Sequence, residues 1–261
     1  MKITTWNING IKARIDGLVA YLKEASPDVI CLQEIKSVDE GFPREPIEDL
    51  GYHVVTHGQK GFNGVAILSK LPLEDVTPRL PGDDADEHAR YLEATVIPKG
   101  GRAVRVASIY LPNGNPIGTD KFAYKLAWMR RLEAHARRGL AEETALVLAG
   151  DFNVIPGPAD AKRPALWTND ALFQPESRAA WRGIVNLGFT DAVRVCHPEP
   201  GLYTFWDYQA GAFQKDDGIR IDHLLLSPQA ADRLRQSGVD KFTRAWEKPA
   251  DHCPAWVELG V

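Results

Sequence analysis

Cysteine is scarce in this sequence, and apolar residues never form a long run. The 261 residues include only three cysteines, Cys31, Cys196 and Cys253, which form neither a close pair nor the spacing of a zinc site. This usage excludes a disulfide framework and suits a reducing compartment, so we expect a cytoplasmic protein. No stretch approaches the roughly 18 consecutive apolar residues of a membrane helix. The residues that begin the chain alternate as a strand does and lack the pattern of a signal peptide.

An excess of positive charge is also missing. The chain carries 31 Lys and Arg residues against 35 Asp and Glu residues, a formal net charge of −4. This balance argues against a protein that coats nucleic acid by charge alone. It leaves room for a local site in which carboxylates recruit a divalent cation that binds phosphate. A Gly-rich phosphate loop and a Gly-x-Ser-x-Gly nucleophile motif are both absent, which argues against these two kinds of hydrolase.

Apolar runs bounded by Gly, Pro and Asp recur along the chain and predict strands. We expect them at residues 2–7, 29–34, 52–57, 64–69, 91–97, 103–111, 145–151, 202–207, 219–227, 242–246 and 255–259. Helical spacing of apolar residues predicts helices around 15–22 and 122–139, and weaker ones at 177–187 and 228–236. Helices at such irregular intervals do not fit a regular alternation of strand and helix. The pattern instead indicates a single α/β domain over residues 1–261, with a two-sheet sandwich flanked by helices.

Polar side chains fall where several of these strands end, which is where a rigid scaffold can hold them over a common face. Asn7 ends the first strand, and its carboxamide can bind a carboxylate, a water or a metal, although an Asx turn is the commoner reading. Glu34 ends the second strand. Because a buried carboxylate is costly without a partner, Glu34 should have a cation beside it, either a bound metal or a structural ion pair.

Later strands end in the same way. Tyr110 closes one strand, where its phenol can bind a phosphate oxygen or merely cap the core. Asp151 follows another strand, and alternation places Asn153 on the same side. A carboxylate and a carboxamide side by side can hold an attacking water and a phosphoryl oxygen, although a plain turn gives the same pattern.

An Asp and a His complete the inventory. Asp222 falls in the middle of an apolar run, and His252 precedes the last strand. Together they suggest a dyad in which the carboxylate orients the imidazole, whereas a lone His is more often structural. The combined set is rich in oxygen donors, which fits Mg²⁺ or Mn²⁺ better than zinc. Such a set is typical of metal-assisted hydrolysis of a phosphate ester.

With these residues in order, the sequence resembles the exonuclease III type of apurinic/apyrimidinic endonuclease, within the endonuclease/exonuclease/phosphatase superfamily. The matching segments span nearly the whole chain: Trp6-Asn7-Ile8-Asn9-Gly10, Leu32-Gln33-Glu34, Gly64-Val65-Ala66-Ile67-Leu68-Ser69, Tyr110-Leu111-Pro112-Asn113, Gly150-Asp151-Phe152-Asn153, Arg220-Ile221-Asp222 and Asp251-His252. Gly-Asp-x-Asn and Asp-His also occur in phosphatases and sphingomyelinases of the superfamily. The segments Tyr203–Tyr208 and Trp246–Pro249 point to its DNA-repair branch.

The resemblance implies a four-layered α/β sandwich, with two mixed sheets packed face to face and helices outside. It implies a Mg²⁺ or Mn²⁺ site at Glu34, with Asn7 and Asp251 nearby in the same role and with Asp151 and Asn153 close to the ion. Asp151 would position or deprotonate the attacking water. The Asp222–His252 pair would offset charge on the phosphate.

The resemblance also implies a substrate surface. Asn153 and Tyr110 would contact the phosphate, and Arg90 and Asn113 would bind the substrate beside them. Phe205, Trp206 and Ile221 would line a pocket for a flipped-out sugar without its base, although the two aromatic residues could simply be core. Ile219 stands where some members of the family carry Trp, which changes one wall of that pocket. Four basic residues of the long helix could touch phosphates or form a solvated face: Lys121, Lys125, Arg130 and Arg131.

The expected activity is hydrolysis of the DNA backbone 5′ to an abasic site, with 3′→5′ exonuclease and 3′-phosphatase activities in the same site. The expected substrate is double-stranded DNA with abasic sites or blocked 3′ ends, bound by a monomer that does not act at a membrane. Two alternatives remain open at this stage. One is a phosphatase or lipid phosphodiesterase of the same superfamily, and the other is a DNA-binding module without catalysis.

Overall fold

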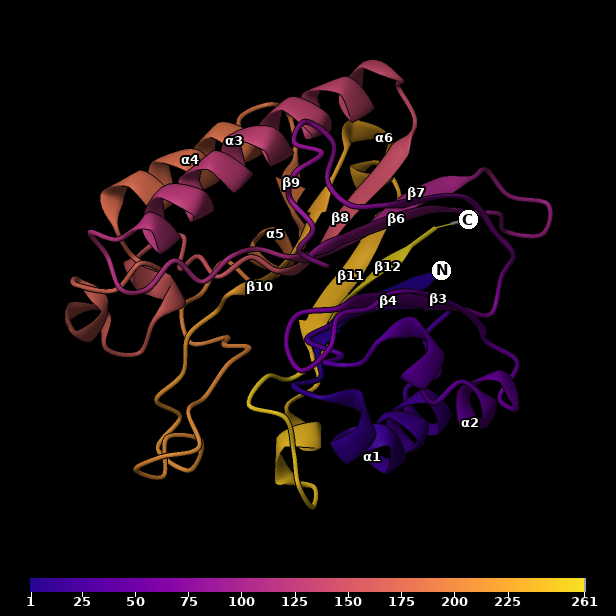
Figure 1. Ribbon diagram of the computed structural model, residues 1–261, viewed down its shortest axis with the longest axis horizontal. Coiled ribbons are helices and arrows are strands. Elements are labelled where there is room, and N and C mark those ends of the chain that lie inside the picture. The colour runs from indigo at the N-terminus through magenta and orange to yellow at the C-terminus, as the bar shows by residue number, and fades with distance from the viewer. Residues whose placement is uncertain (261) are drawn as a thin grey trace.

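Two six-stranded sheets lie face to face in the computed structural model, which describes residues 1–260 (Figure 1). Sheet A has the spatial order β11 (Leu234–Val239), β12 (Ala255–Leu259), β1 (Lys2–Asn7), β2 (Val29–Gln33), β4 (Val65–Ser69) and β3 (His53–His57). Sheet B has the order β5 (Leu73–Pro78), β6 (Tyr91–Val96), β7 (Val104–Tyr110), β8 (Ala145–Asp151), β10 (Asp222–Leu226) and β9 (Thr190–Asp191). Both sheets are mixed, since β1 runs parallel to β2 and β7 parallel to β8 among antiparallel neighbours.

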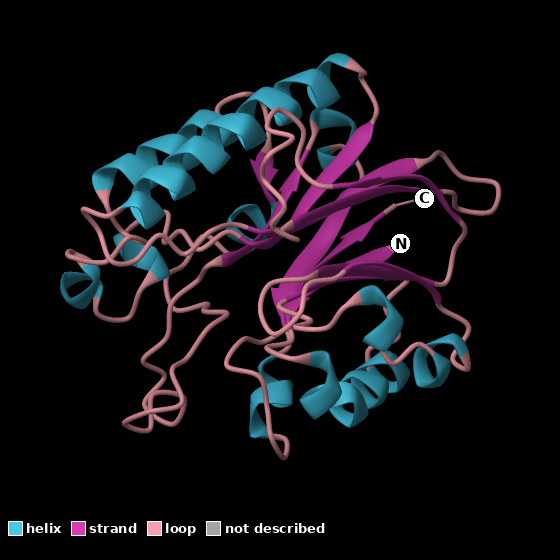
Figure 2. Cartoon of the chain, viewed as in Figure 1, coloured by secondary structure: helices cyan, strands magenta, loops and turns pink. Residues whose placement is uncertain are grey.

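Helices cover the outer faces of both sheets (Figure 2). α1 (Ile11–Glu24) and α2 (Glu45–Glu48) pack on sheet A, whereas α3 (Asp120–Ala141) and α4 (Pro175–Val185) pack on sheet B. The short helices α5 (Ala192–Cys196) and α6 (Pro228–Ala231) lie near the ends of β10 and β8. The predicted four-layered α/β sandwich is therefore confirmed. No helix within residues 1–260 is long and apolar enough to cross a bilayer.

The central strands are apolar on both faces because each face packs against a different layer. In β8, Val147 and Ala149 join the core between the two sheets, whereas Leu146 and Leu148 join the core beneath α3 and α4. Side chains of a strand alternate between its faces, so such a strand reads as a continuous apolar run. This explains why the sequence predicts the central strands well. Cys31 lies in the same inter-sheet core, as expected.

Three of the four edge strands were missed by the sequence prediction. β5, β9 and β11 each end a sheet, and β5 and β11 carry many half-buried or exposed polar residues. Edge strands commonly carry polar and charged residues, which weakens the apolar pattern that signals a strand. The helix predicted at 228–236 ends at Ala231, and β11 follows almost at once.

Two predicted strands are wrong. Residues 202–207 form no strand, because Phe205 makes only isolated bridges to Ile219 and His252. Residues 242–246 lie largely in a 3-10 helix (Lys241–Ala245), whose Phe242 ring stacks on Tyr21 of α1. These apolar residues pack in irregular backbone, so their hydrophobicity imitated a strand.

Strand register brings the polar strand ends to one edge of the sandwich. In sheet A, Asn7 lies opposite Gln33. In sheet B, Asp151 lies opposite Tyr110 on one side and opposite Asp222 on the other. The carboxyl ends of neighbouring parallel strands commonly form binding sites.

This register requires a glycine at position 150. A Cβ atom built on Gly150 would lie 2.0 Å from the carbonyl oxygen of Ile109 on β7. We predict that Gly150→Ala lowers the free energy of unfolding by at least about 2 kcal/mol, because the backbone of β8 must shift to relieve the overlap. Urea denaturation measures this loss. Gly157→Ala is the matched control, since its Cβ would meet nothing closer than 3.8 Å. Equal stability of the two variants would contradict the prediction.

Candidate active site

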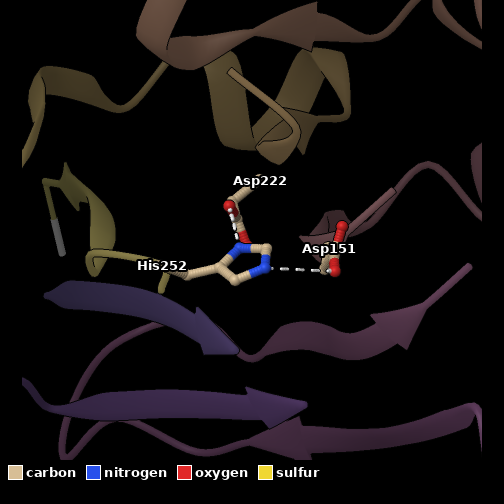
Figure 3. Close-up of side chains that lie close together, drawn as sticks. All are labelled: Asp151, Asp222 and His252. Carbon is tan, nitrogen blue, oxygen red and sulfur yellow. Dashed lines mark hydrogen bonds and ion pairs between the residues drawn. The ribbon is translucent and has the colours of Figure 1, made fainter. Parts of the chain in front are cut away.

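Three buried side chains form a line at this edge: Asp222, His252 and Asp151 (Figure 3). His252 Nδ1 lies 2.8 Å from Asp222 Oδ2, and its Nε2 lies 3.8 Å from Asp151 Oδ2. Asp222 is the first residue of β10, not a residue in the middle of a strand as the sequence suggested. The imidazole therefore lies between two carboxylates that neighbouring strands place opposite each other.

The charges of this line determine its protonation. Burial alone would lower the pKa of His252, but Asp222 and Asp151 outweigh burial and raise it well above its usual range. Burial raises the pKa of Asp151, and the nearby imidazolium only partly opposes the shift. At neutral pH His252 is therefore a cation with both ring nitrogens protonated, and Asp151 holds a proton more readily than an ordinary carboxyl group.

Asn7 connects this line to a second carboxylate. Its Nδ2 donates at 3.0 Å both to Asp151 Oδ2 and to Glu34 Oε1, and its Oδ1 accepts from the backbone N–H of Asn9 at 3.1 Å. Carboxylates only accept, so Asn7 must present its nitrogen to them. The residue expected as a metal ligand is here a hydrogen-bond donor that holds two carboxylates at a fixed separation.

Glu34 has the cationic partner that the sequence required. Lys36 Nζ lies 2.9 Å from Glu34 Oε2, and the hydroxyl of Tyr110 donates to Oε1 at 2.8 Å. Burial alone would raise the pKa of Glu34, but the hydrogen bonds from Asn7 and Lys36 outweigh it and lower the pKa. Glu34 is therefore ionised at neutral pH. Lys36 had not been assigned from the sequence, although its position two residues after Glu34 was a usable signal.

Tyr110 is a neutral hydrogen-bond donor. Burial and the neighbouring carboxylates Glu34 and Asp151 raise the pKa of its phenol well above 10. Arg90 lies over the ring, with its guanidinium carbon 4.9 Å from the ring centroid. The structure thus brings the expected substrate-binding Arg90 to the expected catalytic Tyr110.

Asn153 reaches the site by a turn, not by strand alternation. β8 ends at Asp151, and Asn153 has a left-handed backbone (φ 47°) with its N–H bonded to Asp151 Oδ1 at 2.9 Å. Its Nδ2 donates to the Leu111 carbonyl oxygen at 2.9 Å, and its Oδ1 accepts from Asn113 Nδ2 at 3.2 Å. The loops after β7 and β8 therefore meet through these two carboxamides.

Asp251 lies on the other side of the site, half-buried. Its Oδ1 accepts from Asn9 Nδ2 at 3.1 Å, and Asn9 Oδ1 accepts from Lys36 Nζ at 2.6 Å. Asn9 therefore connects Asp251 to Lys36 and, through it, to Glu34. Asn9 had no role assigned from the sequence, although its position two residues after Asn7 in the first motif was a usable signal.

Comparison with known proteins agrees with this geometry. A profile of the Endonuclease/Exonuclease/phosphatase family matches residues 4–252. The chain belongs to this family. It is 35% identical over 267 residues to the exodeoxyribonuclease III of Haemophilus influenzae, covering 99% of this chain and 100% of that protein.

Solved structures give the same result. An AP endonuclease from Archaeoglobus fulgidus superposes with a TM-score of 0.94 at 37% identity, with full coverage of both chains. A 3′ phosphatase from Neisseria, solved bound to product DNA hairpin, superposes with a TM-score of 0.95 at 38% identity, also with full coverage of both. The predicted exonuclease III resemblance and the fold are confirmed.

The candidate site is rich in carboxylate oxygens, which are suitable ligands for a hard divalent cation. Among residues 1–260, Asp151, Asp222 and His252 form a group whose donor atoms lie within 4.8 Å of one another. A protonated imidazole is a poor metal ligand, so this group serves better as an Asp–His–Asp line. Glu34 is ionised and half-buried, and its Oε2 already faces the cation of Lys36. The residues present therefore fit a cation at Glu34.

An apolar cluster borders the line formed by Asp222, His252 and Asp151. The Phe205 ring contacts His252 with a centroid separation of 5.0 Å, and it packs in a cluster that contains Ile219 and Ile221. Beside Phe205 and Ile219 lies a cavity of about 350 Å³ that is also lined by Trp167. Two of the three expected pocket residues, Phe205 and Ile221, are thus in the cluster, and Trp167 is a wall residue that the sequence did not identify.

The expectation that Trp206 lines this pocket is wrong. The ring of Trp206 is fully buried and packs edge-on against Tyr203 and Phe213, on the other side of its strand-like segment. Successive residues of an extended segment point to opposite sides, so Phe205 and Trp206 cannot both face the site.

A buried ionic network supports the cluster from behind. Arg220, between Ile219 and Ile221, is 1% exposed and binds Asp160 at 2.7 Å and Asp191 at 2.9 Å. It also donates at 3.0 Å to Nδ1 of His223, whose Nε2 donates to the backbone of residue 154. His223 is therefore neutral, because an acceptor nitrogen carries no proton.

This network predicts a pH dependence of stability. Burial and Arg220 lower the pKa of His223 from its usual 6.5 to about 4. His223 therefore binds a proton more readily in the unfolded chain than in the folded one. The contribution of neutral His223 to the free energy of unfolding falls as the pH drops from 6.5 to 4. The loss should be on the order of 3 kcal/mol. Urea denaturation between pH 4 and 7 measures the free energy of unfolding at each pH. This free energy should depend less steeply on pH in His223→Gln than in the wild type. Equal pH dependence in the two proteins would contradict the assignment.

Proposed function

We propose that this chain is a metal-dependent phosphodiesterase that hydrolyses the DNA backbone 5′ to abasic sites and trims blocked 3′ ends. The observation that carries the proposal is the buried line from Asp222 through His252 to Asp151, joined by Asn7 to Glu34. At one edge of the sandwich, this arrangement provides a cation that can offset phosphate charge (His252), a base that can deprotonate water (Asp151) and an anionic site for a metal (Glu34).

Asp151 is the proposed base. Its raised pKa lets it take a proton from water near neutral pH, whereas an ordinary carboxylate would be too weak a base. Asn7 and the backbone N–H of Asn153 each hold one of its oxygens, which fixes its orientation. His252 then stabilises the negative charge that develops on the phosphoryl oxygens, and Asp222 keeps it protonated and oriented.

The phosphate would be held by neutral donors and one cation. The phenol of Tyr110, the carboxamides of Asn113 and Asn153, and the guanidinium of Arg90 gather around the ends of β7 and β8. The carboxamides and the guanidinium are preorganised donors, whereas the single O–H of Tyr110, which donates to Glu34 here, would turn to the phosphate.

We propose Mg²⁺, or Mn²⁺, as the cation. Glu34 would hold it, with Asp251 and Asn7 beside it and the expected ligands Asp151 and Asn153 acting mainly on water and phosphate. A bound divalent cation polarises a phosphoryl oxygen and stabilises the charge on the leaving oxygen. Lys36, which now faces Glu34 Oε2, would give up this contact.

Double-stranded DNA is the proposed substrate, and the apolar cluster around Phe205 and Ile221 would receive a sugar that lacks its base. The names of the relatives, which include an exodeoxyribonuclease III, an AP endonuclease and a 3′ phosphatase, support incision at abasic sites together with 3′-end processing. We expect a monomer acting on DNA in the cytoplasm.

Incision of a labelled duplex with one abasic analogue tests this function. We predict Mg²⁺-dependent cleavage 5′ to the analogue, and a loss of kcat of about 10³-fold in Asp151→Asn, which keeps the shape of the side chain but removes the base. Asp84→Asn, at an exposed aspartate, is the matched control. Hydrolysis of soluble phosphomonoesters or phospholipids with no cut in the DNA would instead indicate the alternative phosphatase or lipid phosphodiesterase. Tight binding to abasic DNA without cleavage would indicate a binding module.

Titration with Mg²⁺ tests the metal site separately. We predict that Glu34→Gln raises the half-saturating Mg²⁺ concentration roughly tenfold or more, because a neutral carboxamide binds a hard cation less strongly than a carboxylate. Glu40→Gln, an exposed residue of the same segment, should behave like the wild type. An unchanged Mg²⁺ requirement in Glu34→Gln would place the cation elsewhere.

A further inference from the structure

Lys125 of α3 is a fully buried lysine whose role the sequence did not reveal. The prediction that it lies on a solvated or phosphate-binding helix face is wrong, since its exposed fraction is 0%. Gly114 packs directly against its aliphatic stem, and a Cβ atom at Gly114 would lie 2.6 Å from Lys125 Cδ. Lys121, one turn earlier on the same helix, is exposed.

The amino group of Lys125 bonds to two loops of the candidate site. Its Nζ donates to the carbonyl oxygen of Asn113 at 3.0 Å and to that of Asn153 at 2.5 Å. The side chains of the same two residues meet at 3.2 Å. Lys125, Asn113 and Asn153 therefore form a closed ring of hydrogen bonds that joins the loop after β7 to the loop after β8.

Burying a lysine to join two loops costs free energy. Desolvation disfavours its charge, and burial lowers the pKa of Lys125 to about 7, although Asp151 and Asp170 oppose the shift. An apolar residue of similar length would fill the same space at less cost, but it would leave two buried carbonyl oxygens without donors. Both the ammonium and the neutral amine can supply the two N–H groups, so the hydrogen bonds persist in either protonation state.

We propose that Lys125 is a positioning residue for phosphodiester hydrolysis, which fixes the Asn113 and Asn153 carboxamides at the separation that the scissile phosphate requires. Its burial beneath both loops prevents contact with DNA, so it acts only through these two residues. This inference rests on the proposed function, in which both carboxamides bind the phosphate. Misplacement of catalytic groups by about 1 Å can cost a hundredfold in rate.

Steady-state incision of the abasic-analogue duplex by the full chain tests this role. We expect Lys125→Met to lower kcat roughly 10- to 100-fold, with KM changed by less than about threefold. Lys125→Gln keeps an N–H donor without the charge and should recover most of kcat. Lys23→Met, at an exposed lysine of α1, is the matched control and should match the wild type. Adding Asn113→Ala to Lys125→Met should cause little further loss, because both changes disable the same carboxamide.

Three results would overturn the positioning role. The first is a wild-type kcat in a folded Lys125→Met variant, and the second is an equal loss of kcat in Lys125→Met and Lys125→Gln. The third is a double variant whose loss of kcat equals the product of the losses in Lys125→Met and Asn113→Ala. If Lys125→Met fails to fold, Lys125→Leu replaces it, since leucine also supplies no donor to the two carbonyl oxygens and adds no strain to the loop backbone. That variant should show the same selective loss of kcat, and wild-type kcat in it would overturn the proposal. Failure of the wild-type chain to cut DNA would instead refute the proposed function.

Discussion

The pairing of β8 with its two neighbours is the constraint on which the site depends. Gly150 lets β8 approach β7 closely, and the same register places Asp151 between Tyr110 and Asp222. A shift of one residue would turn every side chain of β8 to the opposite face, which would bury Asp151 in one of the two cores. The same pairing therefore maintains the core and positions Asp151, the proposed catalytic base.

Charge balance explains why so many ionisable groups can be buried together. Along the edge, carboxylates alternate with donors: Asp222, His252, Asp151, Asn7, Glu34 and Lys36. Each carboxylate thus has a hydrogen-bond donor or a cation beside it, which offsets much of its desolvation. Asp151 stays less acidic than Glu34, because burial raises the pKa of Asp151, whereas the hydrogen bonds from Asn7 and Lys36 outweigh burial at Glu34 and lower its pKa. One group of carboxylates can therefore supply both a base and an anionic metal site.

The sequence predicted what depends on strong local patterns. Central strands such as β8 are apolar on both faces, and the polar residues that end them were found from their position alone. Edge strands such as β11 were missed because their exposed faces carry polar residues. Trp206 and Lys125 were misplaced for a different reason. Whether an aromatic residue faces a pocket, or a lysine faces water, depends on tertiary packing that a single sequence does not display.

The pocket wall at Ile219 bears on the balance of activities. Ile219 is 2% exposed and pairs with Phe205, so the apolar surface remains continuous there. Isoleucine is smaller than tryptophan, and a cavity of about 350 Å³ lies beside Ile219, bounded by Trp167. A pocket that selects a bare sugar by size needs a closed wall, since an apolar slot discriminates only through the space it denies. Additional space beside Ile219 weakens that exclusion, so we expect this chain to process 3′-terminal nucleotides as well as abasic sites.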